Sequence, residues 1–254
     1  MLEDVILFAV VGFAAQMIDG AIGMAYGLSA TSVLLTLGVP PATASASVHA
    51  AEVFTTGASG LAHWRLGNVR RDLVLRLAVP GVLGGILGAT VLVEAPTAAV
   101  RVFVSAYLLV LGGVILRKAL RPRPPAAALP TGQVGALGFC GGVLDAIGGG
   151  GWGAIVTSTL IGRGDVPREA IGSASLAEFF VTAAVSATFV ATVGLSLWPV
   201  IAGLVLGGVL AAPFAALVAR RLPDRPLMAI VGVVVSLLAL RGLLASLRAL
   251  AGGG

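Results

Sequence analysis

The sequence predicts an all-α polytopic membrane protein built from two repeats of about five helical segments each, inserted in opposite orientations. Three observations predict this class: the composition, an internal repeat and the distribution of basic residues. Of the 254 residues, 58% are hydrophobic and 11% are charged, whereas soluble domains carry about 25% charged residues. Such a chain cannot cover a water-facing surface with polar side chains, so we expect it to lie within a lipid bilayer.

An internal repeat covers the start of both halves of the chain. Shifted by 126 positions, residues 13–58 align without a gap with residues 139–184, and 16 of the 46 aligned pairs are identical. The identical pairs include two carboxylate pairs, a proline pair and a Thr-Ser pair. A repeat of this length indicates a duplicated structural unit. We therefore expect a first repeat over residues 1–120, a cytoplasmic proline-rich linker over residues 121–130 and a second, inverted repeat over residues 131–254.

Ten apolar runs, five in each half, predict the helices. The third, fourth and fifth runs of each half reach the length of about 20 residues that a membrane span needs. The first two runs of each half are short and rich in glycine, and they meet at Asp19-Gly20 or at Asp145-Ala146. They form either two short spans or a re-entrant hairpin of two half-helices. We favour the hairpin, which is tolerated only where protein or a water-filled cavity surrounds it. The runs cover residues 5–18, 21–37, 43–63, 73–93, 99–117, 132–144, 152–162, 170–194, 197–219 and 227–247.

The basic residues between these runs predict the orientation. Four loops carry them, whereas the loops near residues 38–42, 94–98 and 194–198 contain no Lys or Arg. The positive-inside rule places the basic loops in the cytoplasm and both chain termini outside. Each half crosses the membrane an odd number of times, so the two repeats face in opposite directions, as in transporters with inverted repeats. The basic residues of these four loops are Arg65, Arg70, Arg71 and Arg76; Arg117, Lys118, Arg121 and Arg123; Arg163 and Arg168; and Arg220, Arg221 and Arg225.

Four carboxylates within or between the apolar runs stand out because each is duplicated in the repeat: Asp19 with Asp145, and Glu52 with Glu178. A charge at membrane depth is unfavourable and usually faces an interior cavity. The two aspartates are suited to cap the helices that follow them. The two glutamates lie in mid-run, where they are either protonated packing residues or proton-titrating groups. We expect all four carboxylates to act in coupling or gating.

A hairpin would start each second half-helix near the bilayer midplane. Its free N–H groups and helix dipole favour an anion there, and an inverted repeat brings two such helix ends together. Glycines allow close backbone approach, and hydroxyls, a histidine and two aromatic residues lie nearby. Small-residue packing, hydrogen bonds within one helix and a buried neutral histidine are the alternative explanations for these residues. The predicted substrate-binding residues are Gly23, Tyr26, Gly27, Thr31, Ser47, His49, Gly149, Trp152, Gly153, Thr157, Ser173 and Ser175.

Motifs for other functions are weak. Residues 57–60 match the G-x-S-G of intramembrane serine proteases, but the downstream His63 lies on the same helix, whereas a catalytic histidine should face the serine from another helix. Residues 162–165 match the G-x-G-D of intramembrane aspartyl proteases, but they fall in a charged loop. The glycine run at 148–151 lacks the Lys-Ser/Thr of a phosphate-binding loop, and no residue spacing fits a metal site. The net charge of +5 comes from the loops and does not indicate nucleic-acid binding. We therefore expect no enzyme activity, no cofactor and no metal.

The duplicated opening resembles that of a known transporter family. Both halves contain Phe-x5-Asp-x3-Gly-x3-Gly, followed by Thr-Ser and Pro-x-x-Ala-x-x-Ser; the opening residues are Phe13, Asp19, Gly23 and Gly27, and Phe139, Asp145, Gly149 and Gly153. With its small size and repeat layout, the whole chain resembles the sulfite exporter TauE/SafE family of bacterial membrane permeases. The resemblance implies transport of small sulfur-containing anions such as sulfite, thiosulfate or organosulfonates including sulfoacetate, across a bacterial plasma membrane. It supplies no residue roles.

Together these observations predict a secondary transporter, an exporter, of a small sulfur-containing anion. Its site would lie between the inverted repeats, with protons as a coupling partner through the duplicated carboxylates. A passive anion channel, an intramembrane enzyme and a non-transporting assembly subunit are the alternatives.

Overall fold

The computed structural model describes residues 2–24, 26–121, 129–219 and 224–252. Within these ranges every regular element is a helix, which confirms the predicted all-α class. Residues 122–128 of the predicted linker lie outside the described residues. The elements are α1 (Leu2–Ile22), α2 (Tyr26–Thr36), α3 (Pro41–Arg65), α4 (Arg71–Glu94), α5 (Thr97–Leu120), α6 (Thr131–Gly148), η1 (Gly153–Thr157), α7 (Ser158–Gly162), α8 (Pro167–Thr192), α9 (Trp198–Ala219) and α10 (Asp224–Gly252).

The repeat pairs begin their helices with matching residues. Pro41 opens α3 and its repeat partner Pro167 opens α8, because a proline at the first helical position removes an N–H that would have no partner there. The second half-helix differs between the copies. In the first copy α2 is one continuous helix of 11 residues, whereas the second copy opens with the π-helical turn η1 and continues as the short α7.

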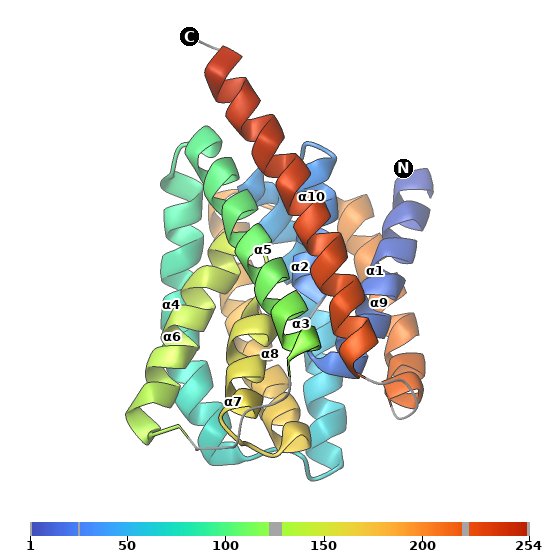
Figure 1. Cartoon of the computed structure of the whole chain (residues 1–254), viewed down its shortest axis with the longest axis vertical. Helices are drawn as coiled ribbons and strands as arrows, with labels where there is room; N and C mark the ends of the chain where they lie inside the picture. The colour runs from blue at the N-terminus through green and yellow to red at the C-terminus, as the bar shows by residue number, and fades with distance from the viewer. Residues whose placement is uncertain (1, 25, 122–128, 220–223, 253–254) are drawn as a thin grey trace.

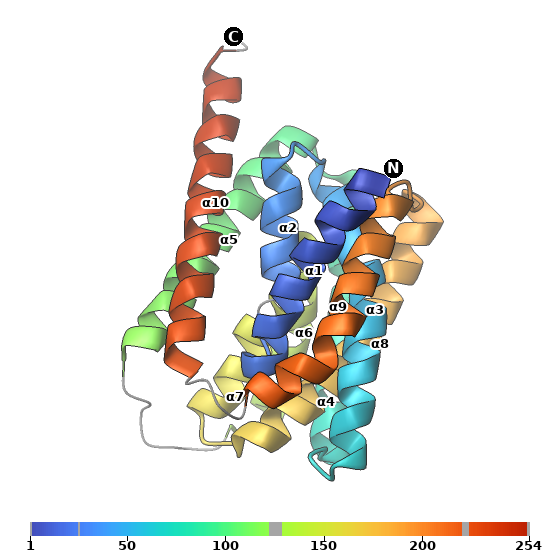
Figure 2. The same cartoon turned by 90° about the vertical axis from the view of Figure 1, so that its right-hand side faces the viewer.

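The helix contacts of the first repeat recur in the second repeat. The opening helix α1 packs along α9, the fourth helix of the other repeat, and its counterpart α6 packs along α4. The paired helices α3 and α8 contact each other, as do α5 and α10. In Figures 1 and 2, α1 starts at the top of the molecule and α2 returns to the top, whereas α6 starts at the bottom and α7 returns there. Each opening segment thus turns back inside the molecule.

Glycines allow the two long crossings to form. At the α4–α6 crossing a methyl group on Gly84 would overlap the carbonyl oxygen of Phe139, and at the α1–α9 crossing one on Gly207 would overlap that of Ala9. Close backbone packing through small residues is the usual way that helices associate in a membrane, where burial of apolar surface gives no net driving force.

The exterior of the bundle is apolar. Four described helices are long and apolar enough to cross a membrane: residues 71–94, 97–120, 167–192 and 228–251, with mean hydropathies from 1.6 to 2.3. Large apolar side chains such as Leu83 and Leu237 are 60% and 62% exposed, as expected of lipid-facing positions. Although α3 has 25 residues, it is not among the four. It carries several hydroxyls, His49 and Glu52, which are buried inside the protein.

Gly84→Ala tests the close α4–α6 crossing. Replacing an exposed helical glycine by alanine normally stabilises a helix by about 0.5–1 kcal/mol, but overpacking at a tight contact costs about 1–3 kcal/mol. We expect Gly84→Ala to lower the melting temperature of the purified protein in detergent. The matched control Gly113→Ala, on α5 with no neighbour near its added methyl, should leave the melting temperature unchanged or raise it. Equal behaviour of the two variants would contradict the close crossing.

Candidate functional site

The first repeat turns back on itself at an aspartate-capped glycine. Gly23 has a φ of +68°, a left-handed conformation that glycine adopts without strain. Its N–H donates to the carbonyl of Asp19 at 2.5 Å. The Asp19 side chain then accepts the backbone N–H of Tyr26, the first residue of α2, at 3.3 Å. One aspartate therefore closes the end of α1 and caps the start of α2.

The second repeat builds the same turn. Gly149 has a φ of +69° and its N–H donates to the carbonyl of Asp145. Asp145 Oδ1 accepts the backbone N–H of Trp152 at 2.8 Å, so the geometry of the first turn recurs 126 residues later. Both aspartates act as helix caps, as one of the alternatives predicted. The N–H groups at the start of each second half-helix that we expected to face an anion are thus partly engaged by protein carboxylates.

The two turns meet through glycine backbone. Gly150 and Gly151 have φ of +133° and +139°, values that residues other than glycine rarely adopt. A methyl group on Gly150 would lie 2.5 Å from the carbonyl carbon of Gly27, so the second turn packs directly on the start of α2. The hydroxyl of Thr31 donates to the carbonyl of Gly149. This contact joins the first repeat to the second at the centre of the molecule.

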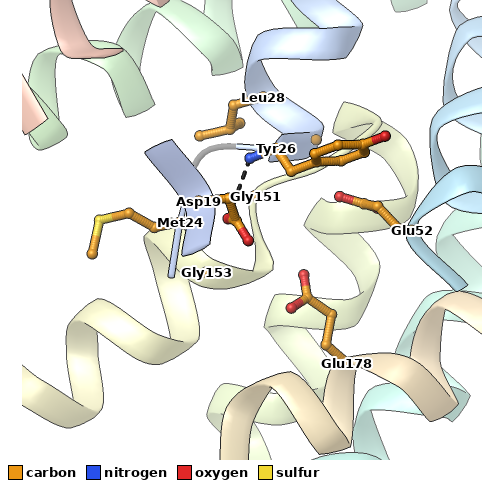
Figure 3. Close-up of a pocket in the computed structure, with 9 residues that line it drawn as sticks. Asp19, Met24, Tyr26, Leu28, Glu52, Gly151, Gly153 and Glu178 are labelled. Carbon is orange, nitrogen blue, oxygen red and sulfur yellow. Dashed lines mark hydrogen bonds between the residues drawn. The ribbon is translucent and has the colours of Figure 1, made fainter. Parts of the chain in front are cut away.

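A narrow cavity lies where the two repeats meet. Its accessible volume is about 10 Å³, which is room for about one water molecule. Figure 3 shows three carboxylates, from Asp19, Glu52 and Glu178, pointing towards this space. None of the described residues that line it is Lys, Arg or His. The lining residues are Asp19, Met24, Tyr26, Gly27, Leu28, Glu52, Gly151, Gly153 and Glu178.

Glu52 is the most enclosed of the cavity carboxylates. It is 3% exposed, and its Oε2 has no hydrogen-bond partner among the described residues. An added methyl on Gly27 would lie 2.5 Å from Glu52 Oε1, so this carboxylate sits against the backbone of α2. Its repeat partner Glu178 comes from α8 on the opposite wall and is partly buried. The duplicated glutamates that sequence reasoning selected therefore converge on one space.

His49 lies behind the cavity and contacts Asp145. Both side chains are 0% exposed, and His49 Nε2 lies 3.1 Å from Asp145 Oδ2. The other ring nitrogen, Nδ1, lies 2.8 Å from the carbonyl oxygen of Ser45. His49 thus links α3 to the capping aspartate of the second turn, and it does not line the cavity.

The repeat partners Tyr26 and Trp152 each donate a side-chain hydrogen bond to the backbone of another helix. The hydroxyl of Tyr26 donates to the carbonyl of Leu204 on α9 at 2.8 Å, and the indole N–H of Trp152 donates to that of Ala174 on α8 at 3.2 Å. Tyr26 lines the cavity, whereas Trp152 is buried behind it. Both aromatic side chains therefore anchor the turns to neighbouring helices through hydrogen bonds.

The remaining predicted hydroxyls lie away from the cavity. The hydroxyl of Ser47 donates to Thr43 of its own helix at 2.8 Å. Ser173 accepts the backbone N–H of Arg70 at 2.9 Å, and so joins α8 to the loop before α4. Thr157 in η1 is buried, Ser175 is partly buried, and neither lines the cavity.

Three cavity residues were absent from the predicted site. Gly151 belongs to a glycine run that the sequence displays, but Met24 and Leu28 are not identical to their repeat partners, Gly150 and Ala154. The site was predicted from glycines, polar groups and aromatic residues, and the apolar Met24 and Leu28 carry no such signal. They enter the cavity because the hairpin places them there.

Comparisons with known proteins give one family and one relative. The family model described as "Sulfite exporter TauE/SafE" matches residues 8–242. The protein "Probable membrane transporter protein YtnM" of Bacillus subtilis (strain 168) is 39% identical over 251 residues, which cover 96% of this chain and 84% of that protein.

Asp145→Ala tests the cap of the second turn. The substitution leaves the N–H of Trp152 without its acceptor, and an unsatisfied buried polar group costs about 1–3 kcal/mol. We expect a clear fall in the melting temperature in detergent. The control Ser47→Ala removes a buried hydroxyl that bonds only within its own helix, and should change the melting temperature little. If Asp145→Ala melts like the wild type, the cap does not stabilise the turn.

Proposed function

Because the chain belongs to the sulfite exporter TauE/SafE family and is a membrane transporter, we propose that it exports small sulfur-containing anions together with protons. The substrates would be sulfite, thiosulfate or organosulfonates such as sulfoacetate. The site would be the cavity between the two repeats, which we propose to be inverted across the membrane, with both termini outside and the bacterial plasma membrane as its location.

The observation that carries proton coupling is the convergence of three carboxylates on a cavity with no described basic lining residue. Two like charges about 4 Å apart repel by about 4 kcal/mol at an effective dielectric constant of about 20. An anion can therefore share this space only when both Glu52 and Glu178 are protonated. We propose that the pair keeps one proton throughout the cycle and takes up a second proton with each anion. A protonated carboxyl also offers an O–H donor to an anion oxygen. Binding of the anion and binding of protons would then be linked.

The glycine-rich turns would supply the remaining contacts. Gly27, Gly151 and Gly153 line the cavity, and a position without a side chain lets an anion reach backbone N–H groups. Tyr26 stands at the same wall. Of the predicted binding residues we retain Tyr26, Gly27 and Gly153 as contacts with the anion. We add Gly151, which was not in the predicted set. Thr31, Gly23, Gly149 and Trp152 would act by holding the turns in place.

The small volume of the cavity supports a carrier. A space for about one water molecule does not admit a sulfur oxyanion, so the walls must separate for the anion to enter. The walls come from both repeats: α2 and α3 of the first, and η1 and α8 of the second. Movement of one repeat against the other around a fixed central site would open the cavity to each side in turn.

Export is compatible with proton coupling when the anion carries more charges than the protons that accompany it. A dianion with one proton leaves as a complex with one net negative charge. A membrane potential of about 100 mV, negative inside, favours the exit of that charge by about 2.3 kcal/mol. The membrane potential would thus drive export even though a proton leaves the cell.

Proteoliposomes test coupled transport directly. With sulfoacetate inside the vesicles, we expect protein-dependent efflux that saturates with concentration and makes the lumen more alkaline, because each anion removes a proton. A pH-sensitive dye in the lumen and labelled substrate measure the two fluxes together. A sulfonate is preferred because sulfite can leak through lipid in its neutral form, and protein-free vesicles measure the remaining leak. Efflux without alkalinisation would exclude the coupling, and non-saturating efflux would favour a channel.

Replacing the cavity glutamates tests whether proton transport can be lost while anion transport remains. Glu52→Gln and Glu178→Gln keep a hydrogen-bonding group but remove the titratable proton. We expect each to abolish the alkalinisation of the lumen and to make the remaining efflux insensitive to pH, whereas the wild type should slow as pH rises at the face where the anion binds. Glu94→Gln, at the exposed end of α4, is the control and should retain coupled efflux. Normal coupling in both cavity variants would remove the glutamates from the mechanism.

A further inference from the structure

The buried pair of His49 and Asp145 has an unusual hydrogen-bond requirement. The Nδ1 atom of His49 lies 2.8 Å from the carbonyl oxygen of Ser45. A carbonyl oxygen only accepts hydrogen bonds, so Nδ1 must carry a hydrogen. The Ser45 hydroxyl, 3.2 Å from the same nitrogen, does not change this assignment, because its one hydrogen is directed at the carbonyl of Ala146 at 2.6 Å.

This assignment leaves a conflict at the other ring nitrogen. In a neutral imidazole with a hydrogen on Nδ1, Nε2 carries only a lone pair. Yet Nε2 lies 3.1 Å from Asp145 Oδ2, and an ionised carboxylate has no hydrogen to give. Two acceptors at this distance repel each other unless a hydrogen lies between them. Burying an uncompensated carboxylate at this depth would be more unfavourable still.

We infer that His49 and Asp145 together bind one proton, and that this proton fixes the glycine turn of the second repeat. The proton lies on Nε2, giving an imidazolium beside a carboxylate, or on Asp145 Oδ2, giving a neutral pair. In both forms one hydrogen bridges the two side chains. The site is separate from the cavity carboxylates, since neither His49 nor Asp145 lines the cavity.

The bridging proton would act on the cavity through the turn. Asp145 uses its other oxygen to accept the N–H of Trp152 at 2.8 Å, and Ser45 of α3 donates to Ala146 beside it. These contacts fasten the end of α6 to α3. The turn that follows supplies Gly151 and Gly153 to the cavity wall. Loss of the proton would set a carboxylate against a nitrogen lone pair and loosen this wall.

The titratable groups that interact with the pair are carboxyls and a tyrosine hydroxyl. Glu52 lies three residues after His49 on α3, Tyr107 of α5 places its hydroxyl 3.5 Å from the carbonyl of Gly150, and the ring of Phe189 on α8 covers the imidazole at 6.2 Å between centroids. The titratable groups that interact with His49 or Asp145 are Glu52, Tyr107 and Glu178 of α8, each neutral or negative. Basic residues of these helices, such as Arg65, Lys118 and Arg168, lie near the helix ends. His49 is thus the group that supplies positive charge to Asp145.

The turn capped by Asp19 lacks an equivalent histidine–aspartate pair. The repeat partner of His49 is Ser175 and that of Ser45 is Ile171. The turn capped by Asp145 would therefore respond to protons through a histidine, whereas the turn capped by Asp19 would not. In an inverted arrangement the two turns serve opposite faces of the membrane, so we expect transport to slow at one face when the pH there becomes alkaline enough to remove the bridging proton. The expected pH sensitivity of transport rests on the proposed function, whereas the presence of the bound proton does not depend on it.

Spectroscopy on the purified full-length protein tests the proton directly. The chain has two histidines, His49 and His63, so His63→Gln leaves His49 as the single histidine for ¹⁵N NMR of its ring. Between about pH 5 and about pH 8, where an ordinary histidine changes charge, we expect hydrogen on Nδ1 throughout. We also expect either a hydrogen on Nε2 or a protonated-carboxyl infrared band that Asp145→Asn removes. An Nε2 without hydrogen, together with an infrared spectrum that Asp145→Asn leaves unchanged, would overturn the proposal. If Asp145→Asn fails to fold, ¹³C-labelled aspartate spectra of the His63→Gln protein report the carboxyl instead.

Transport provides the second measurement. Glutamine at position 49 can donate an amide hydrogen to Asp145 but cannot release a proton. We expect His49→Gln to retain efflux and to lose the slowing at alkaline pH at one membrane face only, while the pH dependence that Glu52 and Glu178 impose remains. A variant that loses efflux entirely, or one that keeps the wild-type pH profile at both faces, contradicts the positioning role. The NMR result stands in either case, so failure of the proposed transport and failure of the proton pair are distinguishable.

Discussion

The whole arrangement depends on satisfying backbone hydrogen bonds at two places where a helix stops inside the protein. A helix end leaves N–H and C=O groups without intrahelical partners, and lipid offers none in their place. Here each break is closed by an aspartate that accepts the N–H of the next half-helix, Tyr26 for Asp19 and Trp152 for Asp145. The carbonyl of Gly149 is then satisfied by Thr31 from the other repeat. The same polar groups that make the breaks possible also bind the two repeats to each other.

Duplication explains why carboxylates gather at the centre. Each copy contributes an aspartate at its turn and a glutamate on its third helix, and the packing of α3 against α8 brings the glutamates to one cavity. A single copy would leave these groups on the surface of a half-bundle. Once two copies pack together, the turns, the glycines and the carboxylates enclose a space that neither copy has alone. The central cavity is therefore a property of the contact between repeats.

Departures from the repeat are as informative as the identities. Tyr26 and Trp152 occupy equivalent places, yet one lines the cavity and the other is buried behind it. α2 is a continuous helix, whereas its counterpart begins with a π-helical turn. π-helical turns are rare and often mark functional sites. Asp145 of the second turn contacts His49 as well as the N–H of Trp152, whereas the repeat partner of His49 is Ser175.

The sequence by itself determined the helical class, the ten segments, the duplicated unit and the aspartates that cap its turns. These features follow from hydropathy and from local backbone requirements, which depend on residues close together in the chain. Only the tertiary structure decided which hydroxyls reach the centre, since Thr31 contacts Gly149 across 118 residues while Ser47 bonds within its own helix. It also decided the partner of His49, which lies 96 residues away, and the entry of Met24 and Leu28 into the cavity. Side chains separated in this way meet only when two repeats pack, and no local pattern records which face of a helix another repeat will cover.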